Sequence, residues 1–287
     1  MSSRLLLACT ALALAACDVS TDERPRQYRN DVFVYATTVP AGQPVLVRNL
    51  RGTITVEPSA DDTLRVAADL AWQGDAEVPN EIRFSGTQVA AGVLICSLFG
   101  DATCTPESYT GQSDGGLRIG TGGARFSLGG KSNAKVSFRI QVPAGVKLDL
   151  VGVDADIVSA STAPVKARTV NGDVTVASAV GPVNIETVNG DIDARMTTLV
   201  GTDSVIAKTL NGSVWVFIPE TASATVDAAT TNGDLDTDFP GLRAPTGTRK
   251  KLEATLGGGE TPVYVRTLNG TVGIGRLDAQ GRSYPRP

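Results

Sequence analysis

The sequence predicts an all-β protein, built as a single-chain β-solenoid (β-helix-like) of stacked two-strand coils. Three observations lead to this prediction. A five-residue motif recurs along the second half of the chain, and the residues around each copy fall into matching columns. No segment shows the apolar period of an ordinary amphipathic helix. Together these features indicate one short β unit that is repeated and stacked on itself.

The repeated motif is Thr-x-Asn-Gly-x. Asn-Gly favours tight bends, because glycine adopts positive φ without strain. Successive asparagines are 18, 22, 21 and 37 residues apart, and the last interval leaves room for one further, degenerate coil. The asparagines that we expect to form a structural turn ladder are Asn171, Asn189, Asn211, Asn232 and Asn269.

The residues before each motif alternate between apolar and polar, as in a strand with one buried face. Valine stands six positions before every asparagine, and threonine stands two positions before it. In stacked coils, identical residues lie about 4.8 Å apart and form ladders of amides and hydroxyls. A hairpin meander, which Asn-Gly alone also suggests, needs no such identity between copies. The columns therefore favour stacked coils.

Two weaker copies of the repeat extend the predicted solenoid toward the N-terminus. Residues 45–56 fit the columns, with Arg51 at a turn position that asparagine occupies elsewhere, and residues 148–157 fit them less closely. Between them, residues 136–142 alternate cleanly up to Pro143 and predict a strand.

Other segments do not join the repeat. Residues 81–135 hold a pair of cysteines and a glycine-rich stretch, and we expect a loop excursion there. We expect a second excursion at residues 237–251. The solenoid domain is expected to span residues 31–287.

The N-terminus has the pattern of a bacterial export signal. Arg4 precedes an apolar run that ends in Leu-Ala-Ala before Cys17, and these residues resemble a lipoprotein box in which the cysteine becomes lipidated. We therefore expect a signal peptide at residues 1–16 and a flexible, lipid-anchored tether at residues 17–30. Asp18 resembles the residue that keeps enterobacterial lipoproteins in the inner membrane, so we expect that membrane to hold the anchor and the domain to face the periplasm. An ordinary signal peptide followed by a chance cysteine is the alternative.

Two cysteines remain after export and lipidation, namely Cys96 and Cys104. An oxidising compartment favours a disulfide between them, closing a short loop. A redox-active pair would more often have the spacing Cys-x-x-Cys, so we predict a structural bond.

Composition excludes several function classes. The 287 residues contain no histidine, which excludes His-based catalysis and nearly every zinc, copper or non-haem iron site. The net charge of −4 argues against nucleic-acid binding. We therefore predict no metal site, no cofactor and no catalytic residue.

One group of residues suggests a ligand surface. The outward column after the turn contains Trp215, Asp193 and Asp236, and we expect the carboxylates to flank the indole on adjacent rungs. An indole between carboxylates could stack a sugar ring, and paired carboxylates could hold calcium. The alternative, which we favour, is that Trp215 packs beneath a loop while the aspartates are solvated turn residues.

Taken together, the repeats resemble the bacterial putative-adhesin family, a domain family of unknown biochemical function built as a β-solenoid. The resemblance rests on the Thr-x-Asn-Gly-Asp repeats and on residues 47–56, 138–150 and 256–274. It implies surface or envelope association and supplies no catalytic residues. The sequence departs from the family pattern at Arg51 and around Cys96 and Cys104.

These observations predict a non-enzymatic, lipid-anchored cell-envelope protein. It would act as an adhesin-like scaffold or as a binding module for envelope polysaccharide or protein, with the membrane as its partner through the N-terminal lipid. The alternative is a polysaccharide lyase or glycosidase that uses Asp and Glu, because two carboxylates can perform such chemistry without histidine.

Overall fold

The computed structural model describes an all-β chain in which every regular element is a strand. It describes residues 26–40, 42–74, 79, 81–110, 116–119, 124–127, 134–160, 163–177, 180–200, 203–240, 242 and 250–283. Eighteen strands form one continuous sheet that folds back on itself into a coil. No helix of these described residues is long and apolar enough to cross a membrane.

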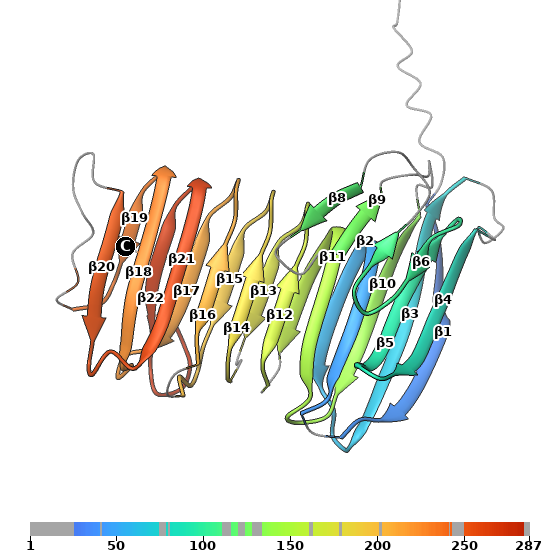
Figure 1. Ribbon diagram of the computed structural model, residues 1–287, viewed down its shortest axis with the longest axis horizontal. Coiled ribbons are helices and arrows are strands. Elements are labelled where there is room, and N and C mark those ends of the chain that lie inside the picture. Colours follow the sequence, from blue (N-terminus) through green and yellow to red (C-terminus); the bar gives the residue numbers. More distant parts are fainter. Residues whose placement is uncertain are drawn as a thin grey trace, which may run out of the picture.

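The central coils consist of short parallel strands in two facing layers (Figure 1). Each coil places one strand in each layer, with a Thr-x-Asn-Gly-x bend between them. The first layer contains β12 (Val165–Arg168), β14 (Val183–Glu186), β16 (Val205–Lys208), β21 (Thr261–Asn269), β18 (Ala224–Asn232) and β20 (Lys251–Leu256). The second layer contains β13 (Val174–Ala177), β15 (Ile192–Arg195), β17 (Val214–Pro219), β22 (Val272–Leu277) and β19 (Leu235–Thr237).

The register between neighbouring coils follows the predicted columns. Val165 pairs with Val183, and Val183 pairs with Val205. All three valines are buried in the space between the layers. Successive residues of each strand alternate between this interior and the surface, as the sequence pattern requires. The β-solenoid prediction is confirmed.

Two long strands continue the solenoid toward the N-terminal end. They are β2 (Pro44–Pro58) and β11 (Lys147–Ala160), and each runs through both layers. Beyond them the second layer continues through β10 (Lys135–Val142) and β3 (Thr63–Gln73) to β1 (Arg26–Thr38) at the edge. The first layer continues through β5 (Gly92–Phe99) and β4 (Ile82–Val89).

Two expectations need correction at this end. Residues 81–135 are not a simple loop excursion, because β5 pairs in parallel with β2 and β4 pairs antiparallel with β5. Small strands follow, namely β6 (Thr103–Cys104), β7 (Tyr109–Thr110), β8 (Gly116–Ile119) and β9 (Ala124–Ser127). The predicted end of the tether at residue 30 also needs correction, because residues 26–30 already belong to β1. Residues 1–25 lie outside the described residues.

The C-terminal end departs from a sequential stack (Figure 1). β21 lies between β16 and β18, so the coil that comes last in the sequence is not last in space. The 37-residue interval between Asn232 and Asn269 contains no extra coil among its described residues. It contains β20, which pairs antiparallel with β18 and covers the outer edge of that strand. Most of the second predicted excursion, residues 241 and 243–249, lies outside the described residues.

Candidate binding surfaces

The asparagines of the repeats form a ladder along one edge of the solenoid. Asn189 donates its side-chain amide to the Oδ1 atom of Asn171 at 2.8 Å, and Asn211 donates to Asn189 at 2.7 Å. The next rung is Asn269, not Asn232. Asn269 donates to Asn211 at 2.7 Å and accepts from Asn232 at 2.8 Å, so all five asparagines lie in one column.

This ladder ends on a carboxylate. The amide of Asn171 donates to Asp154 at 2.6 Å, and Asp154 in turn pairs with Arg51 at 3.3 Å. Arg51, the departure from the repeat pattern, therefore occupies the rung after Asp154, where it balances the charge that terminates the amide column. Every amide dipole along the ladder points the same way, which strengthens the bonds cooperatively. The ladder explains the repeated asparagine by structure alone.

The repeated threonines point inward. The hydroxyl of Thr209 donates to the carbonyl oxygen of Gly190 at 3.1 Å, and Thr187 makes the same bond to Gly172 at 3.2 Å. Both threonines are buried. Each hydroxyl therefore ties one bend to the bend of the neighbouring coil, and the threonine column offers no outer face to a ligand.

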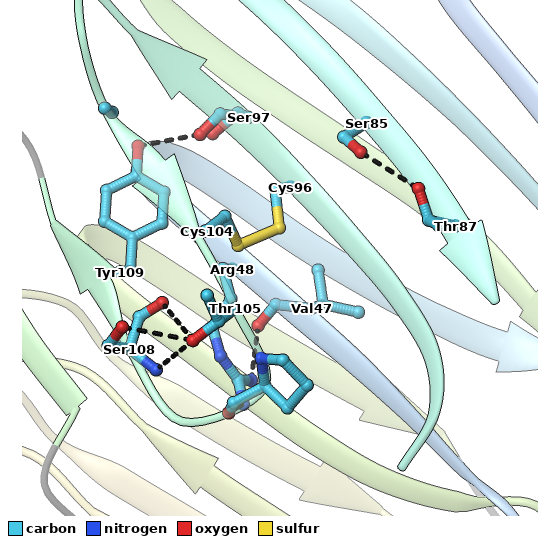
Figure 2. The surroundings of a disulfide bond; sticks show 12 residues. Val47, Arg48, Ser85, Thr87, Cys96, Ser97, Cys104, Thr105, Ser108 and Tyr109 are labelled. Carbon is cyan, nitrogen blue, oxygen red and sulfur yellow. Dashed lines mark hydrogen bonds between the residues drawn. A yellow bond between two sulfur atoms is a disulfide. The ribbon is translucent and has the colours of Figure 1, made fainter. Parts of the chain in front are cut away.

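The predicted disulfide between Cys96 and Cys104 is present (Figure 2). It fastens the loop after β5 against the outer side of the solenoid. Tyr109 lies in this loop, is 1% exposed, and donates its hydroxyl to the carbonyl oxygen of Ser97 at 2.7 Å. Burial raises the pKa of Tyr109 above its usual range. The loop is thus packed as core, together with Val151 and Val153 of β11.

A buried arginine adds a second attachment for this loop. The guanidinium of Arg48 donates to the carbonyl oxygen of Pro106 at 2.9 Å and to that of Asp149 at 2.9 Å. Its side chain is 2% exposed, and Asp149 also forms an ion pair with it at 3.2 Å. Desolvation lowers the pKa of Arg48. Charge-assisted bonds of this kind fix a loop firmly, so this region is structural.

The outer side of the second layer carries a group of aromatic and charged residues, which we call the Trp215 face. Trp215 is partly exposed. Its ring lies against the backbone of β22, where a β-carbon at Gly273 would come within 2.2 Å of the indole Cε3 atom. Phe217 lies in the same way over Gly275. The two rings are nearly parallel, with centroids 5.8 Å apart.

The charged residues of this face lie mainly on β15. Asp193 is the register partner of Trp215 on the adjacent rung. Arg195 donates from Nε to Asp193 at 2.9 Å, which raises the pKa of Arg195, and its guanidinium carbon lies 5.1 Å from the centroid of the Phe217 ring. The aromatic rings are therefore held between β15 and the two glycines of β22.

The expectation that both aspartates flank Trp215 on adjacent rungs is wrong for Asp236. Its register partner is Gly273, which itself pairs with Trp215, so Asp236 lies two rungs from the indole. The reason is the insertion of β22 between β17 and β19. The absent side chain at Gly273 leaves the space that the indole fills.

Sequence reasoning missed the role of Gly273 and Gly275, together with Phe217 and Arg195. The two glycines stand at alternate positions of β22, each opposite an aromatic residue of β17. This pattern predicts that the rings lie over the glycines once the two strands are known to be neighbours. Cys17, the predicted lipidation site, lies outside the described residues. Among the described residues no three Cys, Asp or Glu side chains are grouped to hold a metal ion.

Residues 134–275 match the family described as Toastrack DUF4097. The chain carries a Toastrack domain. The match confirms the resemblance that the repeats predict. No curated protein matches the sequence.

Solved structures similar to the chain include a "putative cell adhesion protein" of Clostridium sporogenes, which is 11% identical. The similarity covers 86% of this chain and 100% of that one, with a TM-score of 0.49. A "putative adhesin" of Bacteroides fragilis is 10% identical, with coverages of 84% and 96% and a TM-score of 0.38.

The limits of the Toastrack domain separate two parts of the chain. The Trp215 face lies wholly within it, since Asp193, Trp215 and Gly273 all fall between residues 134 and 275. The disulfide-bonded loop and strands β1 to β9 precede it. The N-terminal strands therefore extend the Toastrack solenoid with a part that the family does not define.

Proposed function

We propose that this chain is a non-catalytic binding scaffold of the bacterial cell envelope, anchored by lipid at Cys17, whose Trp215 face binds envelope polysaccharide. The observation that carries the proposal is the indole resting on the backbone at Gly273. An aromatic ring braced in this way offers a rigid apolar surface, and its ordering on binding costs little conformational entropy.

The chemistry around the ring suits a sugar. A pyranose ring has an apolar face that can stack on an indole, while its hydroxyl groups require hydrogen-bond acceptors and donors nearby. Asp193 supplies acceptor oxygens one rung away, and its position is fixed by Arg195 at 2.9 Å. Asp236 supplies a second carboxylate beyond Gly273. A repeating polymer could extend along the rungs.

The decisive experiment measures polysaccharide binding by the Trp215→Ala variant. We expect purified envelope polysaccharide to bind the parent chain saturably, and the variant to bind at least tenfold more weakly. The matched control is Tyr264→Ala. Tyr264 is 43% exposed on the first layer and does not belong to the Trp215 face.

Three outcomes would contradict this assignment. Equal affinity of the Trp215→Ala variant and the parent would exclude the face, and an equal loss in the Tyr264→Ala control would indicate non-specific adhesion. Release of new reducing ends from the polysaccharide by the parent chain would favour the lyase or glycosidase alternative.

A separate experiment tests the proposed lipid anchor at Cys17. Cys17→Ser removes the nucleophile that would receive the lipid, so we expect the protein to move from the membrane fraction to the soluble envelope fraction. Continued membrane association would refute lipid anchoring at Cys17. Placement at the inner membrane, facing the periplasm, rests on Asp18 and is tested by separating the two membranes.

A further inference from the structure

A hollow of about 540 Å³ lies on the outer side of the second layer, at its N-terminal end. It is lined by cationic side chains from three strands, namely Arg26 of β1, Lys135 of β10 and Arg51 of β2. Asp154 is the acidic residue among its lining residues and pairs with Arg51 at 3.3 Å. Among the described residues that line the hollow, three cations and one carboxylate give an excess of positive charge.

The register explains why these charges meet. Gly52 pairs with Val136, and Arg51 and Lys135 directly precede these two residues, so both cations lie on one row. Asp154 is the next residue along this row, as the register partner of Arg51. The cationic hollow is therefore the N-terminal continuation of the asparagine ladder, at the end where the repeat pattern stops.

Two of these cations lack an ion-pair partner among the described residues. Within the part of the chain that the structure describes, no carboxylate lies within ion-pair distance of Arg26 or Lys135. Tyr28 lines the same hollow and is 68% exposed. Exposed tyrosine beside arginine and lysine is typical of protein surfaces that rest at a membrane interface.

The proposed anchor is close to the hollow along the chain. Arg26 is the ninth residue after Cys17, and a chain of that length spans at most roughly 30 Å. The tether cannot itself supply the attraction to an anionic bilayer, because Asp18, Asp22 and Glu23 outnumber Arg24. Any electrostatic attraction must come from the folded surface next to it.

We propose that the cationic hollow docks on the anionic phospholipid headgroups of the membrane that holds the anchor. Arg26 and Lys135 would bind phosphate oxygens, and Tyr28 would insert at the headgroup level. This contact would orient the solenoid relative to the bilayer. The proposal rests on the proposed lipid anchor for the position of the hollow, but the binding itself is independent of the lipid.

The test is vesicle co-sedimentation of the mature chain, residues 17–287, carrying Cys17→Ser, so that neither a lipid anchor nor the apolar signal peptide contributes. We expect this chain to bind vesicles of equal parts phosphatidylglycerol and phosphatidylcholine, and to bind pure phosphatidylcholine vesicles far more weakly. Adding Arg26→Gln and Lys135→Gln should weaken binding to the anionic vesicles about 30-fold at low salt. Both side chains are exposed, and thermal unfolding checks that the variant remains folded.

The matched control carries Lys147→Gln and Lys208→Gln, which remove the same charge from exposed positions that do not line the hollow. It should bind the anionic vesicles like the parent. An equal loss in this control, or no preference of the parent for anionic vesicles, would overturn the proposal. Displacement by inorganic phosphate, beyond the effect of chloride at equal ionic strength, would assign the hollow to a discrete phosphate ligand instead. The fractionation test of Cys17→Ser is separate, so failure of the hollow and failure of the anchor are distinguishable.

Discussion

The close approach of successive bends makes Gly190 the position where an added methyl group should be most informative. Gly190 has φ +155°, a conformation that only glycine adopts readily. A β-carbon there would lie 2.0 Å from the carbonyl oxygen of Gly172 on the neighbouring rung. That oxygen belongs to the backbone and cannot turn away. Gly190→Ala must therefore separate the two rungs.

The expected cost has two parts. The unfavourable φ contributes about 1–3 kcal/mol. Separating the rungs of Gly172 and Gly190 weakens the hydrogen bonds between them, such as the 2.9 Å bond from the amide of Gly172 to the carbonyl oxygen of Asn189. Two such bonds contribute about 1 kcal/mol each. We expect the free energy of unfolding to fall by about 3–5 kcal/mol in total, a large part of the usual stability of a domain.

Urea denaturation followed by circular dichroism measures this loss, with Gly74→Ala as the matched control. Gly74 also has a positive φ, +122°, but nothing lies within 4 Å of the position of its β-carbon. The control should therefore lose only the conformational part, about 1–3 kcal/mol. If Gly190→Ala were no more destabilising than Gly74→Ala, the close stacking of bends would be refuted.

Three further predictions concern the interior and the disulfide-bonded loop. Val205→Asp should lower the unfolding free energy by about 4 kcal/mol or more, because it places an unpaired charge between the layers. Ile206 is the next residue and faces outward, so Ile206→Asp should cost far less. Similar melting temperatures for the two variants would contradict the assigned faces. Replacing Cys96 and Cys104 by serine should lower the unfolding free energy by about 2.5 kcal/mol, as expected for so short a closed loop, and an unchanged urea midpoint would show that packing alone holds the loop. Burial raises the pKa of Tyr109, so the unfolded chain loses the phenol proton at a lower pH than the folded chain, and stability should fall above pH about 10. Tyr109→Phe should reduce this loss of stability at alkaline pH. An unchanged dependence of stability on pH would exclude Tyr109 as the cause of the loss.

The repeats made most of the solenoid predictable. Alternating apolar residues fix which side of a strand is buried, and identical columns fix the register between coils, because a shift of one residue would expose every valine. The disulfide was predictable from the spacing of the two cysteines together with the predicted export signal. The N-terminal strands were harder to predict from the sequence, because β4 and β5 carry no copy of the motif although they join the same sheet.

The Trp215 face shows where such reasoning fails. The repeat pattern aligns the residues of one column correctly, but it predicts that the coils follow one another in space as they do along the chain. That order puts Trp215 between two aspartates, whereas the structure places Asp193 on one side of it and Gly273 on the other. The glycine is what permits the indole to lie against the sheet, so the assumed order concealed the feature that shapes the face.

The amino-acid sequence by itself determined the two-strand coil, its buried columns and the residues that each bend requires, because these depend on local alternation and on the conformational freedom of glycine. Only the tertiary structure decided which coil lies beside which. Every coil presents the same valines, threonines and asparagines, so any one could pair with any other at nearly the same energy. The antiparallel strand β20 along the edge of β18, and the insertion of β21 beside β16, resolve this degeneracy through contacts between residues far apart in the chain.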